Sequence, residues 1–249
     1  MEILNTKKSV LLTERDYFIL KGLYDYVVMS FPQITSQYFK DKSKPTIINR
    51  LSKLESAGFV NKYKIPRLIS GKDKNVISVV YQISRTGIRE LEKRFSKIKF
   101  YPEPIKLQPY SIDHDLLLVD VVLTLKENQP ELQMMMGEHF YKTKMPNTPK
   151  PDALIYGLLG TKPVALELEL TAKSEKRYRE LILKYRLSKE FDSILYVTES
   201  DVIQTKIQNL VGPISSQNYF KFTSLEDILQ NNKNHSDLQI VAESEVKIC

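Results

Sequence analysis

Apolar side chains near the start of the chain recur at the three- and four-residue spacing of amphipathic helices. The first such helix follows Thr13, which can form a capping box with Asp16. Two more helices are expected at residues 32–39 and 45–56, and Gly58 is placed to end the second of these. Four residues form the apolar stripe expected to face the core in the helix at 45–56: Ile47, Ile48, Leu51 and Leu54.

The pattern then changes from helical to strand-like. Two strand-like runs, at residues 59–66 and 75–83, are joined by a polar turn and predict a β-hairpin. A further helix is expected from Thr86 to about Phe95. Three helices, a hairpin and a closing helix predict an α+β winged helix-turn-helix domain over residues 1–99.

The third helix and the hairpin carry the residues expected to bind double-stranded DNA. The polar residues expected on the outer face of the helix are Lys44, Thr46, Asn49, Arg50 and Lys53. The basic residues of the hairpin are Lys62, Lys64, Arg67, Lys72 and Lys74. Asn and Arg side chains on such a helix read base edges in the major groove, so Asn49 and Arg50 are expected to contact bases. The hairpin lysines are expected to contact phosphates, whereas use of this domain for protein contact or dimerisation is the alternative.

The charge distribution favours the DNA-binding interpretation. Residues 1–110 carry a net charge of +11, whereas residues 111–249 carry −4. A basic domain joined to a mildly acidic one indicates that the first part meets a polyanion. A solvated basic surface without a partner is the other interpretation of the same excess.

The second part of the chain predicts a mixed α/β domain at residues 111–230. Residues 100–110 contain three prolines and are expected to form a stiff linker, and residues 231–249 form a polar tail. A helix, three strands, a helix and a strand follow one another in the predicted core. The stretch from residue 142 to 151 is basic, and it supplies two further candidate DNA contacts, Lys142 and Lys144.

The clearest predicted strand of this domain, residues 164–171, carries a pair of carboxylates. Because side chains alternate along a strand, Glu167 and Glu169 are expected on one face, with Asp152 at the start of the preceding strand. Three carboxylates that converge suit Mg²⁺ or Mn²⁺, which prefer hard oxygen ligands. A strand whose charged face lies in solvent is the alternative explanation.

Pro151-Asp152, then Glu167-x-Glu169, then Lys184-Tyr185 resembles the PD-(D/E)XK nuclease fold. The resemblance implies that Asp152, Glu167 and Glu169 bind the metal and take part in catalysis. The strand position that usually holds the lysine of this fold is Glu169 here. Lys184, or less favourably Lys173, would then supply the positive charge from outside the strand.

The whole arrangement is similar to the replication-relaxation family of plasmids and integrative elements. The similarity rests on Leu-Thr-x-Arg-Asp at residues 12–16, on His114-Asp115-Leu116, on Pro151-Asp152-Ala153, and on the strand and helix motifs around Glu167 and Lys184. It implies a DNA-binding factor in replication or DNA relaxation, with other replication or relaxosome proteins as partners.

Three functions remain open at this stage. The first is a DNA-binding factor of a mobile element whose second domain nicks or grips DNA, and a homodimer is left open as its assembly. The second is a transcription regulator with a degenerate, non-catalytic second domain, and the third is a site-specific endonuclease of the restriction or transposon-end type. A Tyr relaxase is disfavoured because the sequence has no His-x-His cluster. ATP use is not expected, because the sequence has no Gly-rich phosphate loop.

Composition indicates the compartment. No run of 18 apolar residues occurs, the first residues do not resemble a secretory signal, and Cys249 is the only cysteine. We therefore expect a cytoplasmic protein with no membrane contact and no disulfide framework.

Overall fold

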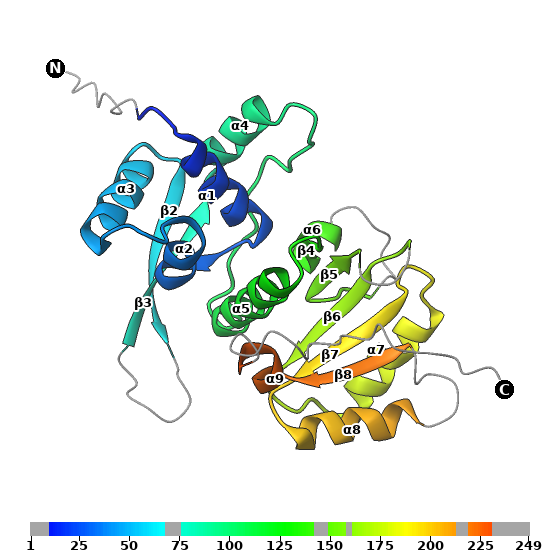
Figure 1. Cartoon of the computed structure of the whole chain (residues 1–249). Helices are drawn as coiled ribbons and strands as arrows, with labels where there is room; N and C mark the ends of the chain where they lie inside the picture. The colour runs from blue at the N-terminus through cyan, green and yellow to red at the C-terminus, as the bar shows by residue number, and fades with distance from the viewer. Residues whose placement is uncertain (1–9, 68–75, 142–148, 158–160, 213–218, 231–249) are drawn as a thin grey trace. The chain divides into compact units, whose positions relative to one another are not determined.

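The computed structural model describes residues 10–67, 76–141, 149–157, 161–212 and 219–230. These residues form a mixed α+β protein that divides into two compact units, Met1–Val119 and Asp120–Cys249 (Figure 1). The boundary lies within one helix, α5 (Ile112–Asn128). No helix among the described residues combines the length and the apolar composition needed to cross a membrane.

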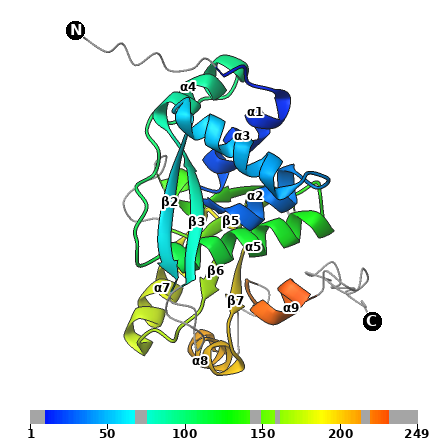
Figure 2. The same cartoon turned by 90° about the vertical axis from the view of Figure 1, so that its left-hand side faces the viewer.

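The described residues of the first unit form the helices α1 to α4, the start of α5, and an antiparallel sheet with the strand order β1-β3-β2. Its elements are α1 (Glu14–Asp25), β1 (Met29–Ser30), α2 (Phe31–Tyr38), α3 (Lys44–Ser56), β2 (Val60–Arg67), β3 (Val76–Ile83) and α4 (Arg85–Arg94). Figure 2 shows the hairpin of β2 and β3 extending beyond the helices of this unit. The predicted three helices, hairpin and closing helix are therefore present, and the short strand β1 is an addition.

Local sequence signals explain where the helices of this unit begin and end. Thr13 caps α1 through a capping box in which the Asp16 side chain accepts from the backbone N–H of Thr13 at 2.6 Å. Gly58 follows α3 with a φ of 78°, a left-handed conformation that favours glycine. Its neighbour Phe59 donates its N–H to the carbonyl of Leu54 at 2.9 Å, which completes a Schellman motif. The two signals predicted from the sequence are confirmed.

Residues 100–110 differ from the stiff linker that the prolines suggested, because they pack against the first unit. Phe100 is buried and packs edge-on against Tyr24, with ring centroids 4.9 Å apart. The hydroxyl of Tyr24 accepts from the N–H of Tyr101, and the carbonyl of Ile105 accepts from the side chain of Gln82. The prolines keep the segment out of helices and strands, but its apolar side chains pack on the first unit. The segment therefore belongs to that unit.

The second unit is built around a five-stranded mixed sheet with the strand order β4-β5-β6-β7-β8. Pairing is antiparallel from β4 to β6 and parallel from β6 to β8. Its elements after α5 are β4 (Gln133–Met136), α6 (Gly137–Tyr141), β5 (Ala153–Tyr156), β6 (Val164–Glu169), α7 (Glu175–Leu187), β7 (Ser193–Thr198), α8 (Asp201–Val211), β8 (Phe220–Ser224) and α9 (Leu225–Gln230).

Every residue of the two central strands β6 and β7 is buried. Central strands with helices packed on them are buried on both faces, which explains their nearly continuous apolar sequences. Apolar and aromatic residues of β5, β6, β7, β8, α7 and α8 form one core cluster. The two carboxylates of β6 therefore lie inside the unit and not on a solvated face.

Candidate functional site

The outer face of α3 carries polar and basic side chains that are free to meet a partner. Lys44, Thr46, Asn49 and Lys53 are all exposed, whereas Ile47, Leu51 and Leu54 face the core. Thr46 shares a hydrogen bond of 2.9 Å with the hydroxyl of Ser43. Ile48 was expected in the core but is 44% exposed, because it lies at the edge of the apolar stripe. The face is therefore polar, with one apolar side chain at its edge.

Arg50 does not project from this face as expected. Its Nε donates to Asp16 Oδ1 at 2.8 Å, and its Nη2 donates both to Asp16 Oδ2 and to the carbonyl of Leu11. Asp16 is buried in α1, so the pair joins α1 to α3. Burial alone would raise the pKa of Asp16, but hydrogen bonds from Arg50 and Thr13 outweigh it and lower that pKa. The structure thus gives Arg50 a stabilising role in place of the predicted base contact.

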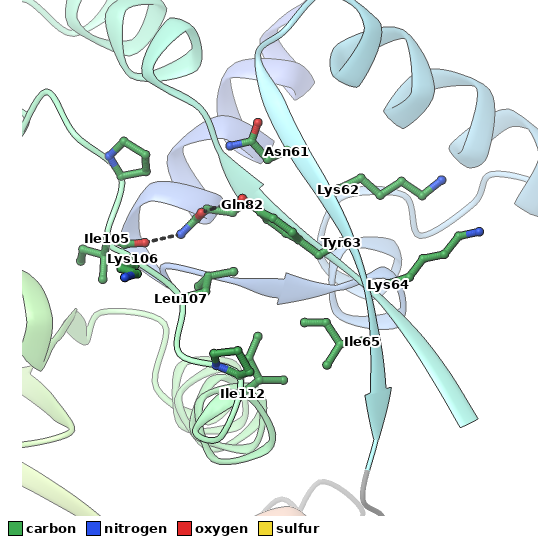
Figure 3. Close-up of a pocket in the computed structure, with 12 residues that line it drawn as sticks. Asn61, Lys62, Tyr63, Lys64, Ile65, Gln82, Ile105, Lys106, Leu107 and Ile112 are labelled. Atoms are coloured by element: carbon green, nitrogen blue, oxygen red, sulfur yellow. Dashed lines mark hydrogen bonds between the residues drawn. The ribbon is translucent and has the colours of Figure 1, made fainter. Parts of the chain in front are cut away.

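The hairpin presents two lysines on the face opposite its packed side. In Figure 3, Lys62 and Lys64 point away from Tyr63 and Ile65, as alternation along β2 requires. Arg67 is the last residue of β2, and its side chain is not described. Four other predicted DNA contacts lie outside the described residues: Lys72, Lys74, Lys142 and Lys144.

The carboxylates of β6 are covered by two tyrosines of α7. Tyr185 donates its hydroxyl to Glu167 Oε1, and the hydroxyl of Tyr178 bonds to Glu169 Oε2 at 3.3 Å. The two tyrosines are seven residues apart, so they lie on one side of α7 and reach two residues that share one face of β6. Glu167 is 4% exposed and Glu169 is 1% exposed. This arrangement agrees with the prediction that both glutamates share one face of the strand. The alternative, a strand whose charged face lies in solvent, is wrong because both glutamates are buried.

Asp152 lies beside Glu167 on the neighbouring strand. It precedes β5, and the pairing of Ala153 with Leu166, continued by one residue, places Asp152 opposite Glu167. Its Oδ2 accepts from the backbone N–H of Leu168 at 2.8 Å. The sheet register therefore gathers the carboxylates of Asp152 and Glu167, as the sequence spacing suggested.

Lys173, and not Lys184, supplies the positive charge beside these carboxylates. The Nζ of Lys173 lies 2.5 Å from Glu169 Oε1. Burial would lower the pKa of Lys173, but the negative charges of Glu169, Glu167 and Asp152 raise it overall. Lys184 lies on the exposed side of α7, next in sequence to the buried Tyr185. Lys173, in the turn that follows β6, therefore lies closer to the carboxylates than Lys184 on the exposed side of α7.

The pKa of Glu167 is strongly perturbed by its surroundings. Burial and then the charge of Asp152 raise the pKa of Glu167 well above its ordinary value, against the hydrogen bond from Tyr185. Tyr196 pairs with Glu167 across the parallel strands β6 and β7, and its buried hydroxyl has no hydrogen-bond partner among the described residues. Burial raises the pKa of Tyr196, so this hydroxyl stays protonated and able to donate.

The donor set suits a divalent cation with two protein carboxylates. Within the described ranges, no group of three or more His, Cys, Asp or Glu side chains is arranged to hold a metal ion. Glu169 is paired with Lys173, and the sheet register places the two other carboxylates, those of Asp152 and Glu167, next to each other. Mg²⁺ is commonly held by one or two carboxylates together with water and substrate oxygens. The three-carboxylate set is thus narrowed to two, and Mg²⁺ or Mn²⁺ binding itself stays a prediction.

We predict that Glu167→Gln stabilises the protein when divalent cations are absent and the pH is neutral or higher. Because the folded pKa of Glu167 is raised, the folded chain keeps this proton over a range of pH in which the unfolded chain, with a pKa near 4.5, has already lost it. Wild-type stability therefore falls as pH rises from that value to the folded pKa, by about 1.4 kcal/mol for each pH unit between the two. Glutamine cannot ionise, and its carbonyl still accepts from Tyr185.

Urea unfolding at pH 5 and pH 8 measures this effect. The difference between Glu167→Gln and wild type should grow at the higher pH. Glu180→Gln, on the exposed side of α7, is the matched control and should show no such growth. An equal effect of Glu167→Gln at both pH values would show that Glu167 is ionised in the folded chain.

Sequence reasoning missed the tyrosines and underrated Lys173. Tyr178 and Tyr185 were not among the predicted site residues, and their spacing of seven residues after a Glu-x-Glu strand was the available signal. His114, at the start of α5, has its Nδ1 3.5 Å from Asp115 Oδ1, and its functional role stays a prediction.

The chain has no detected similarity to proteins of known function or structure. No model of a known protein family matches it, and no curated protein or solved structure matches it significantly. The resemblance to the replication-relaxation family therefore stays a prediction that these comparisons leave untested.

Proposed function

We propose that this chain is a double-stranded DNA-binding protein whose first unit is a winged helix-turn-helix. The single observation that carries the proposal is the exposed face of α3, where Lys44, Asn49 and Lys53 lie free of the core. A helix of this width and polarity fits the major groove of B-DNA. The Asp16–Arg50 pair supports this use, since it fixes α3 against α1 and leaves the remaining polar side chains outward.

The hairpin is proposed to contact the phosphate backbone beside that groove. Lys62 and Lys64 project from one face of β2, and Lys64 is exposed. Lysine contributes to DNA affinity chiefly by neutralising phosphates, so these contacts position the protein without reading the sequence. The net charge of +11 over residues 1–110 is consistent with this role.

Two kinds of variant separate base contacts from phosphate contacts. Asn49→Ala is expected to weaken binding by about 1–3 kcal/mol on a duplex selected from a random library, and by less on unselected duplexes. Lys62→Ala should weaken all duplexes alike and reduce the salt slope of binding by about 1. Lys97→Ala removes an exposed lysine elsewhere in the unit and serves as the control. Equal losses for Asn49→Ala on selected and random duplexes would contradict the proposed base contact.

A second proposal concerns the second unit, which we infer to be a PD-(D/E)XK nuclease-like domain. Its supports are the order of helix and strands, the mixed five-stranded sheet, and the adjacent carboxylates of Asp152 and Glu167. These two residues would hold Mg²⁺ or Mn²⁺, and such an ion neutralises charge on a phosphodiester and activates water. Lys173 keeps a positive charge beside Glu169. Metal-dependent DNA nicking is the activity that this set would serve.

We further propose, from the resemblance alone, a place in the replication or relaxation of a mobile element. Replication or relaxosome proteins would then be partners in the cytoplasm. The competing function is a transcription regulator with a non-catalytic second unit, and the buried Glu169–Lys173 pair is the observation that favours it, because that pair also has a purely structural explanation. Metal dependence decides between the two.

A further inference from the structure

A cavity of about 700 Å³ lies within the first unit, behind the strand that carries the hairpin lysines. It is lined by β2, by Gln82 of β3, and by the segment from Pro104 to Ile112 (Figure 3). Every lining residue belongs to the first unit. This volume is in the range of sites for small organic ligands. None of the proposed DNA contacts on α3 lines it, whereas the proposed phosphate contacts Lys62 and Lys64 belong to the strand that forms one of its walls.

The walls of the cavity are mostly apolar. In Figure 3, Tyr63 and Ile65 of β2 face the same space as Leu107 and Ile112. Ile65 and Leu107 are only partly buried and pack against a small core cluster that includes Ile112. Tyr63 is 38% exposed. Partly exposed apolar side chains around one hollow gain free energy when an apolar ligand removes them from water.

The polar groups at the cavity are neutral or cationic. Gln82 is 4% exposed, and its Nε2 donates to the carbonyl of Ile105 at 2.6 Å. This bond ties the segment to β3 at Ile105, beside the cavity. Three lysines are among the lining residues, but Lys62 and Lys64 point away from Tyr63 and Ile65, which leaves Lys106 as the lysine of the segment beside the cavity. No Asp or Glu is among the lining residues of the described chain. The electrostatic potential at the mouth therefore favours an anion.

We infer that this cavity binds a small amphipathic anion with an aromatic or branched apolar body and one carboxylate or sulfonate. The apolar body lies between Tyr63, Ile65 and Leu107, and the acid group lies at the mouth near Lys106. Charge complementarity selects this class over neutral ligands. It also selects this class over cations, which Lys106 repels.

Fluorescence titration of the full chain with 1-anilinonaphthalene-8-sulfonate tests the inference. Saturable 1:1 binding is expected, with at least tenfold weaker binding of the neutral N-phenyl-1-naphthylamine. Indole-3-acetate should displace the probe competitively, whereas the neutral indole-3-ethanol should not. Binding that does not saturate, or equal affinity for the charged and neutral probes, would overturn the inference.

Variants locate the binding at this cavity. Leu107→Trp places a bulkier ring at the proposed site of the apolar body and should weaken saturable binding at least fivefold, and circular dichroism with urea unfolding checks that the chain stays folded. Lys106→Glu changes an exposed residue, so folding should be unaffected, and it should weaken the sulfonate probe at least fivefold. Lys97→Glu is the matched control with the same change of charge. Unchanged affinity in both Leu107→Trp and Lys106→Glu would place the probe elsewhere and contradict the assignment. None of these readouts requires DNA, so their failure is distinct from failure of DNA binding.

Discussion

Arg50→Ala is expected to destabilise the first unit by about 2–3 kcal/mol. The substitution leaves the carboxylate of Asp16, which is only 1% exposed, without its cationic partner. Removing one member of a buried ion pair costs about 3–5 kcal/mol, and the 24% exposure of the Arg50 side chain reduces that figure. Because Thr13 still donates to Asp16, the loss should not reach the upper value. Urea unfolding at pH 7 measures it.

The pH dependence of this effect has a definite sign. The folded pKa of Asp16 is lowered, so the stability from its ionised form is present above the ordinary pKa of 3.8 and is lost as pH falls through the folded value. The cost of Arg50→Ala should therefore shrink in strong acid. Arg50→Lys, which keeps the charge but loses the two-pronged geometry, should fall between wild type and Arg50→Ala. If Arg50→Ala leaves the stability unchanged and weakens binding to a selected duplex, Arg50 contacts a base, as the sequence predicted.

Mg²⁺ is expected to stabilise the wild-type chain, and Asp152→Asn should remove this stabilisation. Asp152 and Glu167 lie at paired positions, and burial with their mutual repulsion raises the pKa of Glu167. A bound cation relieves that repulsion. At a cation concentration of one hundred times the dissociation constant, binding stabilises the folded state by about 2.7 kcal/mol. Thermal unfolding with Mg²⁺, with Mn²⁺ and with EDTA measures the shift.

The second readout for this site is cleavage of supercoiled plasmid with either metal. Glu180→Gln is the control and should keep the metal response. Asp152→Asn should lose both metal responses while duplex binding by the first unit is unchanged. If wild type ignores millimolar Mg²⁺ and Mn²⁺ in unfolding and leaves the plasmid uncut, the nuclease proposal fails. The regulator would then be the better account.

The sequence predicted the first unit well because its signals are local. Caps such as Thr13 and Gly58, and apolar spacing along each helix, depend on residues a few positions apart. The positions of Ile48 and Arg50 were wrong for a common reason. The neighbouring helices decide which residues at the edge of the apolar stripe of α3 are covered, and the sequence of α3 does not show this. The helix α1 supplies the buried Asp16 that binds Arg50.

The candidate site of the second unit was predictable in part. Alternation along a strand placed Glu167 and Glu169 together, because that geometry is fixed by the backbone. Their burial under Tyr178 and Tyr185 was not predictable, since it depends on where α7 returns to the sheet. The position of α7 relative to the sheet also decides that Lys173, and not Lys184, lies beside the carboxylates, and the sequence does not show that position. The 100–110 segment was taken for a linker because its prolines are visible in the sequence, whereas its contact with Gln82 is not.

Binding of the full wild-type chain to a fluorescent 30-base-pair random duplex tests the central claim most directly. Anisotropy titrations from 50 to 200 mM salt should show binding. The logarithm of the association constant should fall linearly with the logarithm of the salt concentration, at a slope of about −3.6. This slope corresponds to about 0.9 for each of four phosphate contacts, made by Lys44, Lys53, Lys62 and Lys64. The Lys44→Glu/Lys53→Glu variant, altered only on the exposed face of α3, should bind at least tenfold more weakly than wild type. No measurable binding at 50 mM salt, or an affinity that does not change with salt, would contradict the account.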